Sequence, residues 1–162
     1  MYPDSALKLN FEDAESIGFF SWTYDPLNPW SSHAVEAWGQ RFITVESAYH
    51  YRKFSETAPE VAHEVWQAGS PWAAMRVDRA HREQRRADWH EVKVGIMREL
   101  FALKFEQHQD VRECLAATGS KRILETSPVD AFWGVGPDGT GRNTIGQLWM
   151  DLRAERLGHK KA

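Results

Sequence analysis

Three side chains that could exchange protons lie at helical spacing in segment 44–54, which reads Thr-Val-Glu-Ser-Ala-Tyr-His-Tyr-Arg-Lys-Phe. Glu46 and Lys53 are seven positions apart, nearly two helical turns, and His50 lies between them on the same face. A carboxylate, an imidazole and an ammonium on one face can transfer protons and stabilise developing charge. The spacing also fits a solvated polar face with a helical ion pair, which is worth only about 0.3–0.5 kcal/mol.

A glycine-rich segment, 130–143, is the second candidate site. Glycines let a backbone approach a ligand closely, and the free amides of a following helix suit phosphate. Residues 134–139 spell G-x-G-x-x-G, but no long buried strand precedes them and no Gly-Lys-Ser/Thr follows. Neither a dinucleotide-binding fold nor a P-loop is therefore predicted. The alternative interpretation is a surface turn built on Pro137, Asp138 and Gly139.

Arginines provide a third candidate in the run 76–86, where Arg76, Arg79, Arg82 and Arg86 are spaced to form one helical stripe. Such a stripe could bind phosphates or a nucleic-acid backbone, but a charge-rich solvated face is the favoured interpretation. The eight tryptophans fit either packing or a cleft that stacks on a flat ring. The other histidines lack a spacing typical of metal sites, so no metal is expected.

The elements that must position these residues are mainly helices. Turn signals such as Asp25-Pro26 and Asn28-Pro29 favour irregular or β structure over 1–43. Caps for helices are predicted at Thr44, Ser70, Asp88 and Asn143. Helices are expected over 44–54, 59–69, 71–80, from 89 onward, 110–118 and from 144 onward, with a short strand at 121–125. In the longest helix, the predicted apolar face consists of Val92, Ile96, Leu100 and Leu103, with Met97 and Phe101 beside it. The pattern predicts a mainly α-helical α+β fold with a few short strands.

Composition limits the classes of protein further. The 162 residues are 42% hydrophobic, which suits a single domain over 1–162 and excludes general disorder. The formal net charge of −3 provides no global basic field to recruit nucleic acid. A single cysteine, Cys114, fits a reducing compartment, and neither a secretory signal nor a membrane span is recognisable. We therefore expect a cytoplasmic protein with no membrane partner.

Five blocks of sequence occur in a fixed order along the chain. They are Thr44 to Phe54, Trp89 to Lys93 with Met97, Leu103 to Phe105 with Gln107, Glu125 to Gly134, and Gly141 to Gly146 with Met150 and Arg153. These blocks resemble motifs of the NADAR superfamily, the YbiA-like proteins, such as T-x-E-H-x-[YF]-Q-x-x-K-F for the first and E-x-[ST]-x-x-D-x-[YF]-W-G for the fourth. The resemblance covers about residues 18–157, which is the expected core of the domain.

The resemblance implies a compact, largely helical fold and hydrolysis of N-glycosidic bonds without a cofactor. Two substrate classes are associated with the family: ribosylamino-pyrimidine phosphate intermediates of riboflavin biosynthesis, and ADP-ribose attached to guanine in nucleic acid. Glu46 is then the expected general acid/base, and Lys53 forms a Schiff base with C1 or stabilises the leaving group and phosphates. Asp130 orients a ribose hydroxyl or water. The expected substrate-binding residues are Ser21, His50, Trp89, Trp133, Gly134, Gly136, Gly141 and Asn143.

The chain departs from the family pattern at the expected site. Where F-S-N-F is usual, Ser21 is followed by Trp22, so an asparagine contact would be lost or supplied by Asn28. Ser47 and His50 replace the usual histidine and glutamine. Two further function classes stay open. One is a non-catalytic module that binds ADP-ribose or a nucleotide, and the other is a nucleic-acid-binding domain that uses the arginine stripe.

Overall fold

The computed structural model describes residues 9–20 and 22–158. The chain divides into two compact units. One is Pro29–His108, and the other combines the described parts of Met1–Asn28 and Gln109–Ala162. In sequence, the first unit is therefore an insertion within the second. The expectation of one domain over 1–162 stays a prediction.

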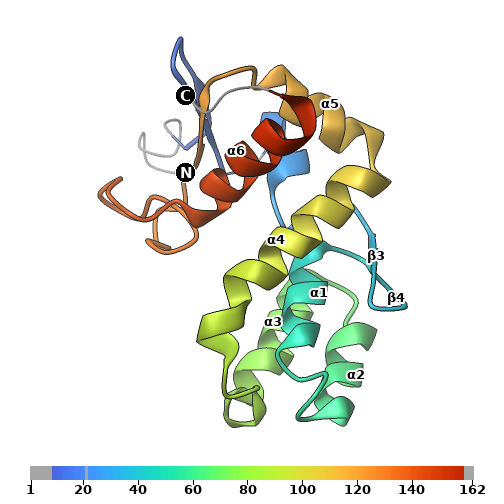
Figure 1. Cartoon of the computed structure of the whole chain (residues 1–162). Coiled ribbons are helices and arrows are strands. Elements are labelled where there is room, and N and C mark those ends of the chain that lie inside the picture. Colours follow the sequence, from blue (N-terminus) through green and yellow to red (C-terminus); the bar gives the residue numbers. More distant parts are fainter. Residues whose placement is uncertain (1–8, 21, 159–162) are drawn as a thin grey trace. The chain divides into compact units, whose positions relative to one another are not determined.

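The unit Pro29–His108 consists of a hairpin and a group of helices (Figure 1). Strands β3 (Val35–Ala37) and β4 (Gln40–Phe42) pair antiparallel. The helical elements that follow are α1 (Val45–Arg52), α2 (Pro59–Gln67), α3 (Pro71–Ala80), the 3-10 turn η3 (Arg82–Gln84) and α4 (Trp89–Gln107). Helix α1 packs against α2, α3 and α4, so side chains from several helices can meet around it.

Local sequence explains where these helices begin. The Thr44 hydroxyl accepts a hydrogen bond from the amide of Ser47 at 3.0 Å, and Ser70 accepts one from Ala73 at 3.1 Å. Pro59 and Pro71 occupy first helical positions, where the missing amide hydrogen costs nothing. A hydrophobic core holds α2 and α3 together with the segment after α1. Its buried residues are Phe54, Ala58, Val61, Ala62, Val65 and Ala74.

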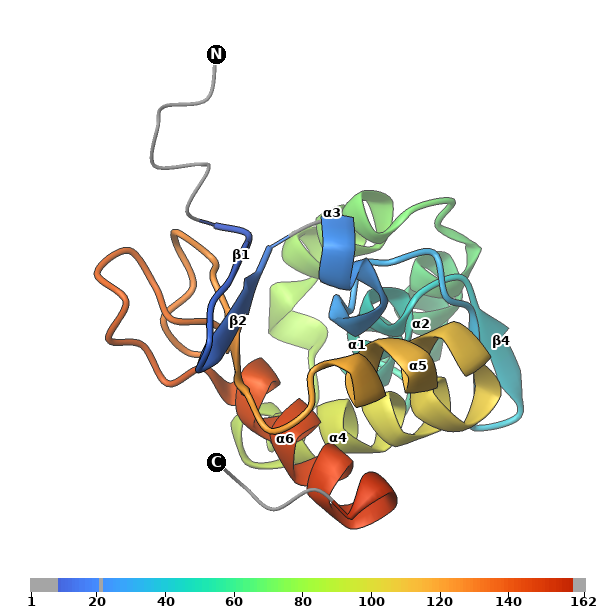
Figure 2. The ribbon, with the colours of Figure 1, turned by 90° about the horizontal axis from the view of Figure 1, so that it is seen from above.

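The other unit is a small sheet covered by helices. Its strands are β1 (Phe11–Glu12), β2 (Ser16–Phe19) and β5 (Arg122–Glu125), in the order β1-β2-β5. Figure 2 shows β1 and β2 side by side; they are antiparallel, whereas β2 and β5 are parallel. The helical elements are η2 (Trp22–Leu27), α5 (Gln109–Ala117) and α6 (Thr144–Leu157). Helix α6 packs on β5 and buries Trp149, which donates its indole hydrogen to the Leu27 carbonyl at 2.8 Å.

The predicted fold class is confirmed, and each predicted helix is present with its ends shifted by a few residues. The cap predicted at Asp88 is wrong, because its carboxylate pairs with Arg86 at 2.6 Å and makes no capping bond. The apolar face predicted for α4 is correct only in part, because Val92 and Leu103 are half-buried, whereas Phe105 is buried. In the part of the chain that the structure describes, no helix combines the length and apolar character needed to cross a bilayer.

Candidate active site

The three ionisable side chains predicted on one face of α1 lie together and are largely removed from solvent. His50 Nε2 is 3.0 Å from Glu46 Oε1, and Lys53 Nζ is 3.2 Å from His50 Nδ1. His50 and Lys53 are 4% and 5% exposed, and the Glu46 side chain is 13% exposed. The interpretation as a solvated polar face is therefore wrong. Buried ionisable groups of this kind concentrate at functional sites, although structural networks also contain them.

Asp78 on α3 completes this cluster, and the sequence analysis missed it. Its Oδ2 lies 2.6 Å from Lys53 Nζ and 2.8 Å from His50 Nδ1, and its Oδ1 accepts a hydrogen bond from Arg85 Nε at 2.5 Å. In sequence, Asp78 looks like one counter-charge in an arginine-rich run. It follows Ala74, which is also buried, by one helical turn, and this spacing is the signal that could have revealed it.

The predicted arginine stripe does not form, because α3 ends at Ala80 and Arg82 lies in the separate turn η3. Arg76, Arg79 and Arg82 are exposed, as the favoured solvated-face interpretation expects. Arg86 instead pairs with Asp88. The arginine run therefore contributes one side chain, Arg85, to the buried cluster.

Hydrogen bonding indicates where the protons of the cluster lie. Burial acts to raise the pKa of Asp78, but the hydrogen bond from His50 and the charge of Lys53 hold that pKa well below its usual range. Asp78 is thus ionised, and a carboxylate oxygen 2.8 Å from an imidazole nitrogen requires a proton on that nitrogen. Burial acts to lower the pKa of His50, but hydrogen bonds with Asp78 and Glu46 outweigh it and raise that pKa.

Aromatic rings enclose the Lys53 ammonium. Its Nζ lies 4.8 Å from the ring centroid of Tyr49 and 5.4 Å from that of Trp89, and the two rings meet edge to face. Burial lowers the pKa of Lys53, and the charge of Asp78 offsets part of this effect. Because Trp89 is only 5% exposed, its geometry favours exclusion of water over stacking on a base.

Asp130 and Trp133 lie in the other unit, in the loop between β5 and α6. Asp130 Oδ1 accepts hydrogen bonds from the amides of Phe132 at 2.9 Å and Trp133 at 2.8 Å, so this oxygen shapes a turn. Trp133 is half-buried, with its ring edge-on to Phe132. The roles predicted for Asp130 and Trp133 toward substrate stay predictions.

Several amides of the glycine-rich loop donate hydrogen bonds to the loop's own carbonyls, and the expected use of the loop amides in binding phosphate stays a prediction. Gly141 donates to Val135 at 2.6 Å and Asn143 donates to Gly134 at 3.0 Å. A Cβ on Gly134 would overlap Glu125 Oε2, so glycine is needed there for close packing. Pro137, Asp138 and Gly139 are exposed, as a surface turn requires. Substrate contacts by Gly134, Gly136 and Gly141 remain untested predictions.

Asn143 precedes α6 but does not cap it with its side chain, which corrects the sequence analysis. Its Oδ1 accepts from the amide of Glu125 and its Nδ2 donates to the Ile123 carbonyl, both at 2.8 Å, so it fastens the start of α6 to β5. Glu125 is a second missed carboxyl. It is 9% exposed, and burial raises its pKa to about 7 despite a hydrogen bond from the Ser127 amide.

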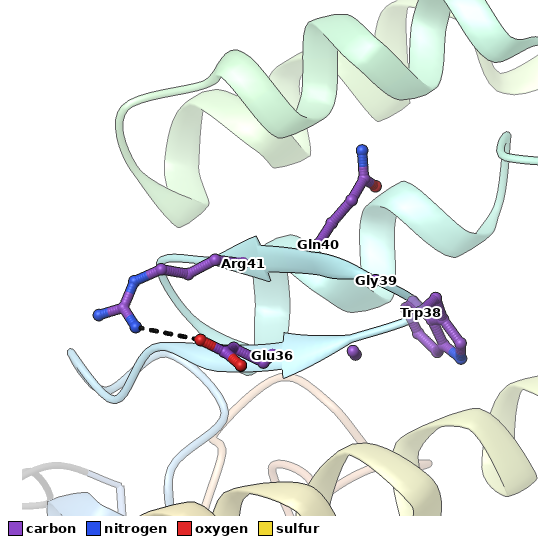
Figure 3. Close-up of a pocket in the computed structure, with 6 residues that line it drawn as sticks. Glu36, Trp38, Gly39, Gln40 and Arg41 are labelled. Atoms are coloured by element: carbon purple, nitrogen blue, oxygen red, sulfur yellow. Dashed lines mark ion pairs between the residues drawn. The ribbon is translucent and has the colours of Figure 1, made fainter.

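Two further parts of the chain, the segment around Ser21 and the β3–β4 hairpin, add no group to the candidate active site. Ser21 lies outside the described residues, and Asn28, the suggested substitute for the missing family asparagine, donates its side-chain amide to the Phe20 carbonyl at 2.9 Å. Figure 3 shows a surface hollow at the β3–β4 hairpin, where the exposed Glu36 and Arg41 form a weak 4.0 Å pair. Across residues 9–20 and 22–158, no three His, Cys, Asp or Glu side chains are grouped as a metal site requires.

The structure combines a mainly helical fold with an acid, an imidazole and an amine that lie together and are largely removed from solvent. Comparison with known proteins identifies its relatives. A model of the NADAR domain matches residues 10–157, so the chain belongs to the NADAR family. The N-glycosidase Npun_R5314 of Nostoc punctiforme is 35% identical over 133 residues, which are 82% of this chain and 85% of the relative.

Two further relatives extend the comparison. The N-glycosidase YbiA of Escherichia coli is 34% identical over 148 residues, 90% of each chain. Its NMR structure superposes with a TM-score of 0.80, covering 94% of this chain and 93% of that one at 30% identity. The riboflavin biosynthesis protein VVA0006 of Vibrio vulnificus is 35% identical over 114 residues, which are 70% of this chain and 30% of that protein.

Proposed function

We propose that the chain is a hydrolase that cleaves the bond between ribose C1 and an exocyclic amine. The observation that carries this proposal is the buried Lys53 amine, whose Nζ lies 3.2 Å from His50 Nδ1, beside the Glu46 carboxyl that His50 Nε2 contacts at 3.0 Å. The curated relatives named as N-glycosidases support the class of hydrolases acting on N-glycosyl bonds. The substrate is accordingly a nucleotide or a related small molecule.

The chemistry of such a bond suits these side chains. A glycosylamine can open to an imine, which an amine can intercept, or it can break through an oxocarbenium-like transition state. In either route Glu46 is the general acid/base that protonates the departing nitrogen and deprotonates water. Lys53 either adds to C1 as a Schiff base, which its desolvation favours, or stabilises charge on the leaving group. Asp130 keeps its predicted role of orienting a ribose hydroxyl or water, and Trp133 is expected to stack on the base or to exclude water.

Two substrate classes share the bond in question. The Vibrio vulnificus relative is named as a riboflavin biosynthesis protein, which supports ribosylamino-pyrimidine phosphates of that pathway as substrates. ADP-ribose on the exocyclic amine of guanine in nucleic acid offers the same C1–N connection and is the second candidate. Offering both substrates side by side, with release of ribose 5-phosphate or ADP-ribose as the readout, decides between them.

The role of Lys53 is tested by reduction with borohydride during turnover. A Schiff base would be trapped as a stable adduct on the peptide that contains Lys53, and Lys53→Arg would lose it. Lys121→Arg is the matched control, because Lys121 lies in the other unit in an ion pair with Glu12. Unmodified Lys53 with turnover intact would eliminate the covalent route and leave the charge-stabilising one.

The role of Glu46 is tested with Glu46→Gln, which keeps the shape of the side chain but cannot exchange a proton. We expect kcat to fall by about a hundredfold or more, the range of general acid–base catalysis. Glu60→Gln, at an exposed position of α2, is the control and should retain normal turnover. Near-normal turnover by Glu46→Gln would remove Glu46 from the mechanism.

The alternative, a non-catalytic module for ADP-ribose or nucleotide, predicts a different pattern. It would bind ADP-ribose without releasing product from either substrate, and Glu46→Gln and Lys53→Met would leave binding unchanged. A shallow dependence of binding on salt would point to a pocket, whereas a steep one would point to contacts with a nucleic-acid backbone. The expected cytoplasmic localisation stays a prediction.

A further inference from the structure

We propose that His50, held by Asp78, is a positioning residue that relays protons to and from Glu46. This inference rests on the proposed function, because it describes how the acid/base of that reaction is recharged. In the family motif that segment 44–54 resembles, glutamine is the usual residue at the position of His50. A glutamine can donate a hydrogen bond to a carboxylate, but it cannot take up or release a proton at neutral pH.

The geometry is that of a continuous hydrogen-bonded line. Asp78 Oδ2 lies 2.8 Å from His50 Nδ1, and His50 Nε2 lies 3.0 Å from Glu46 Oε1. Each ring nitrogen therefore faces a carboxylate, so the imidazole can hold two protons at once. A second carboxylate that orients the ring is the arrangement that fixes the proton on Nδ1 and directs Nε2 toward its partner.

Asp78 is anchored so that it orients His50 without accepting its proton. Lys53 contacts Oδ2 at 2.6 Å and Arg85 contacts Oδ1 at 2.5 Å, and both cations keep the carboxylate ionised. The Asp78 side chain is 2% exposed, so water screens these contacts weakly. Proton movement is thereby confined to the other side of the ring, between Nε2 and Glu46.

Charged groups from its own helix and from the α3 region surround His50. Glu46 and Lys53 come from its own helix, Asp78 comes from α3, and Arg85 follows η3 and acts through Asp78. The Tyr49 ring packs edge to face at 5.6 Å. Burial and the charge of Lys53 oppose an additional proton on His50, but its hydrogen bonds with Asp78 and Glu46 outweigh both and favour that proton.

The proposed step balances its protons and electrons. A proton passes from His50 Nε2 through Glu46 to the leaving nitrogen, which takes the electron pair of the broken C1–N bond. Water adds its oxygen to C1, and the proton that it releases returns through Glu46 to Nε2. The proton on Nδ1 stays in place throughout, so His50 ends the cycle in the state in which it began.

The test compares His50→Gln with the unaltered chain on whichever glycosylamine the unaltered chain hydrolyses. His50→Gln keeps a hydrogen-bond donor near Glu46 but cannot ionise. We expect kcat to fall by roughly a hundredfold, with KM nearly unchanged, and we expect one ionisation to disappear from the pH profile of kcat. Asp78→Asn should retain that ionisation but move it to lower pH, because an anionic neighbour of the imidazole is lost.

His81→Gln is the matched control, because His81 follows α3 but takes no part in the line of contacts from Asp78 to Glu46. Its pH profile should match that of the unaltered chain. If His50→Gln gives the same kcat and pH profile as the unaltered chain, the relay is overturned, while the proposed hydrolysis stands.

A second measurement separates the relay from the proposed function and does not depend on the variants folding. Nitrogen-15 NMR of the unaltered, substrate-free chain reports the protonation of both His50 ring nitrogens. Two protonated nitrogens that persist above the ordinary histidine range support the relay geometry even if neither glycosylamine is cleaved. A ring with one protonated nitrogen at pH 6 overturns it, whatever the chain hydrolyses.

Discussion

Replacing Glu125 by glutamine should stabilise the protein at pH 8 and change its stability little at pH 4. Burial raises the pKa of Glu125 to about 7 from its ordinary value of 4.5. Each pKa unit corresponds to about 1.4 kcal/mol, so ionising this buried carboxyl costs about 3 kcal/mol of folding free energy. Glutamine has nearly the same shape, keeps an acceptor for the Ser127 amide and never ionises.

The sign of the pH dependence follows from proton binding. Between pH 4.5 and about 7 the folded state holds the Glu125 proton while the unfolded state has lost it. The unaltered chain therefore loses stability as pH rises through this window, and the loss is complete above it. Glu125→Gln lacks this loss, so its advantage should grow from near zero at pH 4 to about 3 kcal/mol at pH 8.

Urea unfolding followed by tryptophan fluorescence, at pH 4, 6 and 8, measures this difference directly. Contributions from other titrating groups are common to both chains and cancel in the comparison. Glu15→Gln is the control, because Glu15 is exposed in the same unit and its replacement should change the unfolding free energy little at any of the three pH values. An advantage for Glu125→Gln that is equal at pH 4 and pH 8 would refute the reasoning.

Three other substitutions test the contacts that position the candidate site. Asp78→Ala should lower the unfolding free energy by about 3–5 kcal/mol in urea, because it leaves the buried Lys53 ammonium without its partner, and a loss under 1 kcal/mol would contradict this. Gly134→Ala should lower the unfolding free energy by about 1–3 kcal/mol, because the added Cβ would overlap Glu125. Gly69→Ala is the control, because the space around its Cβ is open, and equal melting temperatures for the two variants would exclude the overlap. Thr44→Ala should cost about 1 kcal/mol by removing the cap of α1, measured by thermal unfolding, and no change would show that the capping bond is dispensable.

The face of α1 could be predicted from sequence because helical periodicity fixes it by counting. That face carries Glu46, His50 and Lys53 whatever surrounds the helix. Their spacing of three and four residues allows His50 to contact both Glu46 and Lys53. Burial could not be predicted in the same way. It depends on α3 and α4, which bring Asp78 and Trp89 to Lys53 from positions more than twenty residues away.

In the glycine-rich loop, the hydrogen-bond partners could not be predicted from sequence. The helix after the loop was correctly predicted, but the hydrogen bonds within the loop were not, since a sequence does not reveal which carbonyl faces each amide hydrogen. Asn143 illustrates this, because it precedes α6 as a cap residue would, yet both ends of its side chain bond to β5. The raised pKa of Glu125 likewise arises from long-range burial, which no local pattern encodes.

The placement of Pro29–His108 between the two halves of the other unit has a consequence for biosynthesis. Strand β2 pairs with β5, whose residues emerge from the ribosome about a hundred positions later, whereas α1, α3 and the start of α4 are complete much earlier. The cluster around Lys53 can therefore assemble while Ile17 and Phe19, which are fully buried in the finished protein, still lack their partner strand. During that interval β2 is an apolar segment with an unpaired edge, which makes it the expected point of contact for chaperones on the nascent chain.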